Sequence, residues 1–98
     1  MKCKSLEEVR GNIDRVDKQI IELIGERKNY VYQASKFKKD ANAVKAPNRV
    51  EAVIEKVRDL ARDNDIDEDL VEAVYRTMIG QFINLEMKAF EETALRLE

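Results

Sequence analysis

Apolar residues recur at steps of three and four along most of the chain, which is the period of helices that bury one face. The first and longest series runs through Leu6, Val9, Ile13, Val16, Ile20, Leu23, Tyr30, Ala34 and Phe37. A second series contains Val50, Val53, Val57 and Leu60. The last part of the chain carries two stripes, one with Leu70, Val71, Val74, Met78 and Leu85 and the other with Tyr75, Ile79, Phe82 and Phe90. The pattern predicts an all-α fold with three helices, over residues 6–39, 49–63 and 67–95.

Three capping-box patterns agree with these helix starts. In each, a short polar residue is followed three positions later by glutamate: Ser5 and Glu8, Asn48 and Glu51, and Asp65 and Glu68. In such a box the first side chain accepts a hydrogen bond from a free backbone amide, and the glutamate reaches back. Asp67 is a rival cap for the third helix. Because proline and glycine are scarce, we expect long helices and few turns, with residues 39–47 as the main irregular segment.

The length of the first helix predicts the assembly. About 34 residues at about 1.5 Å per residue span roughly 50 Å, whereas a compact domain of this chain length has a radius of gyration of only about 13 Å. The other two helices are too short to cover such a rod and close a core. We therefore expect a symmetric homodimer in which the two long helices pack against each other. Each subunit is expected to be a single domain that comprises residues 1–98.

Composition excludes several classes of function. The 98-residue chain has a formal net charge of −2, so its overall field favours neither nucleic acid nor an anionic membrane as a partner. It contains no histidine and one cysteine, Cys3, which excludes a histidine–cysteine zinc site and an internal disulfide. No apolar stretch approaches the roughly 18 residues of a membrane span, and the start of the chain lacks the apolar core of a signal peptide. These observations predict a cytoplasmic protein without a metal site.

Charged residues interrupt the apolar stripes. The first series requires an apolar residue at position 27, where the sequence has Arg27. Lys38 follows eleven positions later, almost three helical turns, so the two side chains point the same way along the first helix. Arg10 lies off that face and most simply reaches the same site from the other subunit, while Arg49 lies at the start of the second helix. These four cations suit a compact dianion, because guanidinium groups bind carboxylates with paired donors and lysine supplies a point charge.

Glu86 continues the second stripe of the last helix, between Phe82 and Phe90. We expect it to be buried, and burial disfavours an ionised carboxylate. A protonated carboxyl group can donate a hydrogen bond, which an ionised one cannot. A structural ion pair inside the helical bundle is the alternative interpretation.

Each cation also has an ordinary interpretation. Arg27 can extend to solvent or pair with a nearby glutamate, and Arg10 can pair with Asp14 one turn away. Lys38 belongs to a basic run of a kind that is usually solvated, and Arg49 can be an ordinary residue of a first helical turn. The joint spacing of these residues, more than any one of them, indicates a binding site.

Three segments together resemble the all-helical chorismate mutases and their close relative, the isochorismate-pyruvate lyase of salicylate and siderophore synthesis. They are VRGNIDRVDKQIIELIGERKNYVYQASKFKK, which is similar to the long first helix of that family, APNRVEAVIEKVRDLA and MIGQFINLEMKAF. The resemblance covers nearly the whole chain, and its site pattern comprises Arg10, Arg27, Lys38, Arg49 and Glu86. It implies a dimer of three-helix subunits whose active sites use both chains, with chorismate or isochorismate as substrate and no cofactor.

The resemblance also implies a role for each of these residues. Arg10 would cross from the partner subunit to bind one substrate carboxylate, and Arg27 would hold the other or share that duty. Lys38 would donate to the ether oxygen of the substrate, and Arg49 would support the site near the ring. Glu86 stands where many bacterial members have glutamine and others, including the eukaryotic branch, have glutamate. In its protonated form it would donate a second hydrogen bond to the ether oxygen.

Three pocket-lining positions depart from the best-studied mutases. Ala46 and Val50 stand where those enzymes have acidic residues near the ring hydroxyl, and Phe82 stands where they have a small hydroxyl residue. The lyase also lacks these polar groups. Chorismate mutase, in aromatic amino acid biosynthesis, is the first expectation, with the lyase as the alternative. A regulatory module that kept the fold and lost catalysis, and a plain coiled-coil dimerisation domain, are the non-enzymatic alternatives.

Overall fold

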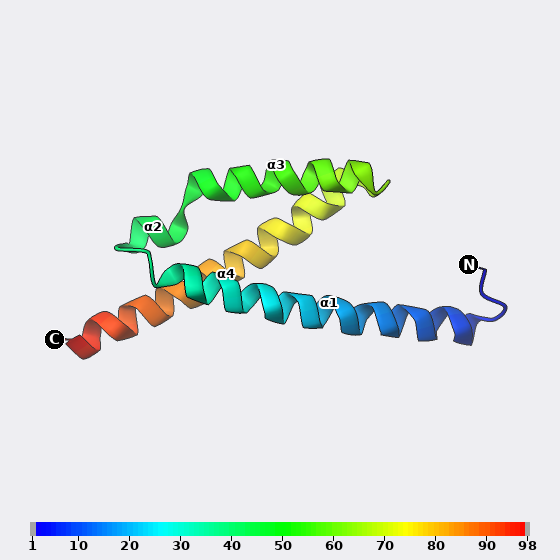
Figure 1. Cartoon of the computed structure of the whole chain (residues 1–98), viewed down its shortest axis with the longest axis horizontal. Helices are drawn as coiled ribbons and strands as arrows, with labels where there is room; N and C mark the ends of the chain where they lie inside the picture. Colours follow the sequence, from blue (N-terminus) through cyan, green and yellow to red (C-terminus); the bar gives the residue numbers. More distant parts are fainter. Residues whose placement is uncertain (1, 98) are drawn as a thin grey trace. The chain divides into compact units, whose positions relative to one another are not determined.

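Four helices make up the described part of the chain, and no strand is found in that part. The computed structural model describes the backbone of residues 2–97 and the side chains of residues 2–92. The helices are α1 (Leu6–Ser35), α2 (Ala41–Lys45), α3 (Pro47–Asp63) and α4 (Glu68–Leu97) (Figure 1). The chain divides into two compact units, Met1–Ala34 and Ser35–Glu98. The all-α prediction is confirmed, and α2 is a short helix inside the segment that was expected to be irregular.

The helix α1 makes up most of the first unit and begins at the predicted cap. The hydroxyl oxygen of Ser5 accepts a hydrogen bond from the Glu8 backbone N–H at 3.1 Å, and the Glu8 carboxylate accepts one from the Lys4 N–H at 3.0 Å. The helix ends at Ser35 and not near residue 39 as predicted. No residue of α1 is buried, so much of its long apolar series is exposed in the single chain.

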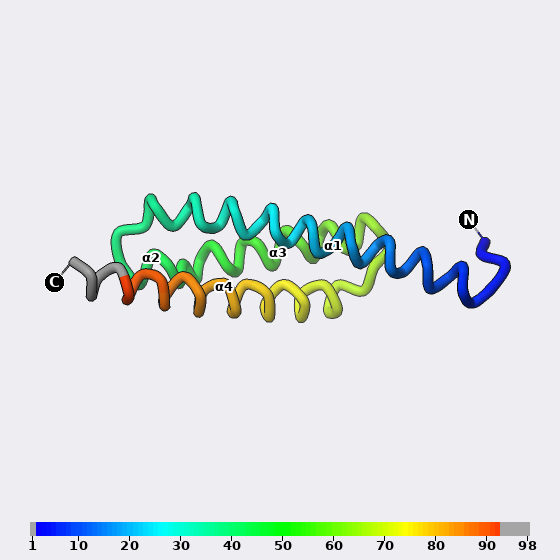
Figure 2. Tube along the Cα trace, turned by 90° about the horizontal axis from the view of Figure 1, so that it is seen from below, coloured from blue at the N-terminus to red at the C-terminus, as the bar shows by residue number. Residues whose placement is uncertain are grey.

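In the second unit, α3 and α4 run in opposite directions and pack against each other, and α2 also packs on α4 (Figure 2). The buried apolar residues of this unit are Val44 on α2, Ile54, Val57 and Ala61 on α3, and Ile79 on α4. The second α4 stripe therefore faces this core, because Ile79 belongs to it. Leu60 was expected in the α3 stripe but is 50% exposed, since the buried line runs through Ile54 and Ala61 and leaves it on the flank.

The segments that connect these helices show that two of the predicted caps are wrong. Ala46 alone separates α2 from α3, with φ 36° and ψ 60° in the left-handed region, and Pro47 opens α3. Asn48 therefore lies inside the helix and is not its cap. The carboxylate of Asp67 caps α4, accepting from two backbone N–H groups of the first turn at 2.8 and 3.1 Å. The alternative prediction, that Asp67 is the cap, is thus confirmed, while Asp65, with φ 58°, forms part of the turn.

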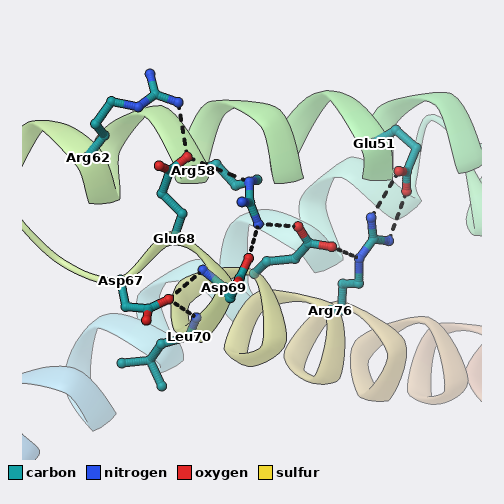
Figure 3. A network of polar contacts seen from close by, with 9 residues as sticks. Glu51, Arg58, Arg62, Asp67, Glu68, Asp69, Leu70 and Arg76 are labelled. Carbon is teal, nitrogen blue, oxygen red and sulfur yellow. Dashed lines mark hydrogen bonds and ion pairs between the residues drawn. The ribbon is translucent and has the colours of Figure 1, made fainter.

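An exposed ion-pair network joins α3 to α4 (Figure 3). Arg76 donates two parallel hydrogen bonds to Glu51, both at 2.9 Å, and one to Glu72 at 2.7 Å. Arg58 donates to Glu72 at 2.7 Å and to Asp69 at 3.1 Å. Hydrogen bonds from Arg76 lower the pKa of Glu51 and of Glu72, and the Arg58 hydrogen bond lowers that of Glu72 further. The network is a structural connection between the two helices outside the core.

Candidate active site

A partly buried lysine–glutamate pair connects the segment before α2 to α4. The Lys38 ammonium donates to Glu86 Oε2 at 3.1 Å. The Glu86 side chain is 4% exposed and that of Lys38 is 23% exposed. Glu86 lies about two turns after the buried Ile79 on the same face of α4, which explains its burial. The predicted burial of Glu86 is confirmed, and its carboxyl group faces a cation.

Lys38 reaches this position from a turn and not from a helix. Because α1 ends at Ser35, the prediction that Lys38 shares a helical face with Arg27 is wrong. Asp40 sets the furthest limit of α1, since it caps α2 in an extended conformation (φ −151°, ψ 173°) and accepts from the Ala43 N–H at 2.8 Å. A residue in that conformation cannot continue a helix, so the chain leaves α1 before it.

The three predicted arginines occupy two different helices. Arg49 lies in the first turn of α3 and is exposed, Arg10 is exposed on α1, and Arg27 is half-buried on α1. Within the described residues Arg10 and Arg49 make no ion pair, so the pairing of Arg10 with Asp14 is not found there. Because Arg10 and Arg27 belong to the first unit and the buried pair to the second, their assembly into one site stays a prediction.

The three predicted pocket-lining residues are all half-buried in the second unit. Ala46 is the joint between α2 and α3, and its carbonyl accepts from the Val50 N–H at 3.0 Å. Phe82 lies on α4 about one turn before Glu86. None of the three side chains carries a hydrogen-bonding group. None of the three side chains could therefore form a hydrogen bond with a ring hydroxyl.

An apolar hollow of about 160 Å³ lies elsewhere, between the end of α3 and the start of α4. Its lining residues are Val57, Leu60, Ala61, Asn64, Ile66, Val71 and Tyr75. It has no charged side chain that could hold a dianion, and neither Lys38 nor Glu86 lines it. Among the described residues, no group of histidine, cysteine, aspartate and glutamate side chains is arranged to hold a metal ion. The candidate site is centred instead on the Lys38–Glu86 pair, in which a cation meets a buried carboxylate.

The helix α2, which follows Lys38, was not predicted from the sequence. A five-residue helix is too short for a periodic apolar pattern, and Val44 is its only buried residue. One signal was present, because Asp40 precedes two alanines and a valine in the segment Asp40–Val44, as a capping residue precedes a helix. No helix in the described part of the chain is both long and apolar enough to cross a lipid bilayer.

Comparison with known proteins identifies the family. Residues 9–87 match the profile of the family described as chorismate mutase type II. The chain is 34% identical over 91 residues to an isochorismate pyruvate lyase of Pseudomonas aeruginosa, covering 93% of this chain and 90% of that protein. It is 25% identical over 91 residues to a chorismate mutase of Methanocaldococcus jannaschii, covering 92% of each. A bifunctional chorismate mutase/prephenate dehydratase of Aquifex aeolicus is 28% identical over 89 residues, which cover 87% of this chain and 25% of that protein. The chain belongs to the chorismate mutase type II family.

Proposed function

We propose that this protein is a chorismate mutase, which rearranges chorismate to prephenate. One observation carries the proposal: in a chain of this family, a lysine and a glutamate meet in a buried pair at 3.1 Å. The reaction breaks one carbon–oxygen bond and forms one carbon–carbon bond within the same molecule. It needs no nucleophile and no redox partner, so catalysis consists of holding the reactive conformation and stabilising developing charge.

Lys38 and Glu86 act on the ether oxygen of chorismate. Negative charge develops on that oxygen as the carbon–oxygen bond breaks, and the Lys38 ammonium stabilises it. Burial strengthens this effect, because a charge pair shielded from water interacts more strongly than an exposed one. Glu86 donates a second hydrogen bond in its protonated form.

The arginines bind the two substrate carboxylates and hold the ring in its diaxial conformation. Arg27 and Arg49 come from the same chain as Lys38, and Arg10 comes from the partner subunit. The absence of ion pairs at Arg10 and Arg49 within the described residues supports this assignment, since both guanidinium groups are available to a carboxylate there.

A second copy of the chain completes the site in this proposal. The support is apolar surface that a single chain leaves uncovered: Ile13 and Leu23 on α1 are 52% and 62% exposed, and Leu70 and Val74 on α4 are 58% and 54% exposed. Burying such faces drives association. Sedimentation at micromolar concentration is expected to give the mass of two chains, and a stable monomer would contradict this part of the proposal.

Isochorismate-pyruvate lyase is the second candidate function. The lyase of Pseudomonas aeruginosa shares 34% of the aligned residues with this chain. In addition, Ala46 and Val50 provide no polar group for a ring hydroxyl. The lyase reaction converts isochorismate to salicylate and pyruvate. It makes the same two demands on the site, with a hydrogen transfer added.

One assay separates the candidates. Purified protein is offered chorismate and isochorismate in separate reactions, and prephenate, salicylate and pyruvate are followed. We expect prephenate from chorismate at a rate far above that of the uncatalysed reaction. Salicylate and pyruvate from isochorismate, without prephenate from chorismate, would assign the lyase. Binding of either dianion without any product would assign the regulatory module.

A further inference from the structure

Lys38 lies outside every helix of the second unit, yet its ammonium is 3.1 Å from Glu86. Its backbone N–H donates to the Ser35 carbonyl at 3.1 Å, which closes the turn after α1. That single bond leaves the course of the following residues open. The position of the ammonium group therefore depends on how the chain continues after Lys38.

The chain continues into α2, which is attached to α4. Asp40 caps α2 two residues after Lys38, and Val44 is 4% exposed and is the only buried residue of this helix. A helix of five residues is not stable by itself. Its packing on α4 therefore keeps it formed, and we expect the buried Val44 side chain to contribute most to this packing.

The far end of α2 is also closely constrained. Ala46 alone joins α2 to α3, in a left-handed conformation (φ 36°) that residues other than glycine rarely adopt. Its N–H donates to the Asn42 carbonyl and its carbonyl accepts from the Val50 N–H, both at 3.0 Å. With one residue between two helices, α2 has little freedom to slide along α4.

We propose that Val44 is a positioning residue for the reaction at Lys38. By anchoring α2 on α4, the helix that carries Glu86, it holds the Lys38 ammonium where it can meet the ether oxygen of the substrate. This inference rests on the proposed function for its catalytic consequence. The placement of Lys38 beside Glu86 can be tested without any turnover.

The chain offers a matched control for this proposal. Val57, on α3, is 6% exposed, so Val44→Ala and Val57→Ala remove the same two methyl groups from similarly buried sites. Both variants are expected to lower the midpoint of thermal unfolding. Only Val44→Ala is expected to lower kcat, by about tenfold or more, because a small displacement of a catalytic group is costly. KM is expected to change little, since the arginines still bind the carboxylates. Val44→Ile, which keeps a branched apolar side chain at this position, is expected to retain most of kcat.

The second readout is the NMR chemical shift of the Glu86 carboxyl carbon, measured without substrate. The Lys38→Ala variant gives the chemical shift that the Glu86 carboxyl carbon has without a neighbouring lysine. We expect Val44→Ala to move the signal toward that value, and Val57→Ala to leave it at the value of the unaltered protein. If the unaltered protein converts neither chorismate nor isochorismate, the proposed function fails while this measurement still decides the positioning role.

Two results would overturn the inference: equal loss of kcat in Val44→Ala and Val57→Ala, or an unmoved Glu86 signal in Val44→Ala. Should Val44→Ala not fold, Asp40→Ala provides a milder perturbation of the same helix. It removes only the exposed capping hydrogen bond of 2.8 Å to the Ala43 N–H. The Glu86 signal is expected to move in this variant as well, and an unchanged signal would again count against the proposal.

Discussion

The two ion-pair sites of α4 differ in burial, in the origin of their partners and in their number of bonds. Glu86 is buried and meets one lysine, which comes from a turn. Glu72 and Arg76, earlier on the same helix, are 28% and 43% exposed and belong to a more exposed network whose members all come from helices. Exposed pairs of this kind contribute little each and hold neighbouring helices in register. Burying an ion pair is more costly, because both charges lose water, and under the proposed function we expect the chemistry at Glu86 and not at the network.

The largest effect is expected when Lys38 is removed. Lys38→Ala should lower turnover by about a hundredfold or more, because it removes the donor to the developing charge. Lys36→Ala, in the same basic run and exposed, is the control and should retain nearly full turnover. Arg76→Ala removes a charge from the network and should affect thermal unfolding far more than kcat. Comparable losses of kcat in Lys38→Ala and Arg76→Ala would remove the distinction between the two sites.

The next effect concerns Glu86 as a hydrogen-bond donor to the substrate. If its carboxyl group donates to the ether oxygen, Glu86→Gln should retain most of kcat, because the side-chain amide also donates, whereas Glu86→Ala should lower kcat. Glu51→Gln, a similar change in the network between α3 and α4, should leave kcat as it is in the unaltered protein. Equal loss of kcat in Glu86→Gln and Glu86→Ala would exclude the donor role.

A smaller effect is expected on stability in acid, and it arises from the network. The pKa values of Glu51 and Glu72 are lowered in the folded chain, chiefly by hydrogen bonds from Arg76. Their contribution is therefore present above the unfolded-state value of about 4.5 and is lost as the pH falls through the folded-state pKa. Thermal unfolding measured from pH 7 to pH 3 should show this loss, and Arg76→Gln should reduce it. An identical acid dependence in both proteins would contradict the assignment.

The smallest effect is that of salt. Exposed charges are screened over about 10 Å at 0.1 M ionic strength, whereas buried pairs are screened much less. Raising the salt concentration should therefore reduce the difference in unfolding midpoint between the unaltered protein and Arg76→Gln. The chemical shift of the Glu86 carboxyl carbon should stay nearly constant over the same range. A shift that moves with salt would show that water reaches the pair.

Much of the helical structure could be predicted because its signals are local. The cap at Ser5, the rival cap at Asp67 and the burial of Glu86 follow from residues a few positions apart, and the structure confirms all three. Two other predictions were wrong for one reason. The placement of Lys38 on the first helix and of a cap at Asn48 both assumed that residues 39–47 form a loop without helical structure.

Periodicity along the chain by itself determined the all-α class and the apolar face that carries Glu86, because side chains three and four positions apart share one side of a helix. It could not show that Lys38 leaves α1 and meets Glu86, since the two residues are 48 positions apart. Only the tertiary structure decided that meeting. It depends on the docking of α2 on α4 and on the one-residue joint at Ala46, which are set by packing between elements and not by local preference.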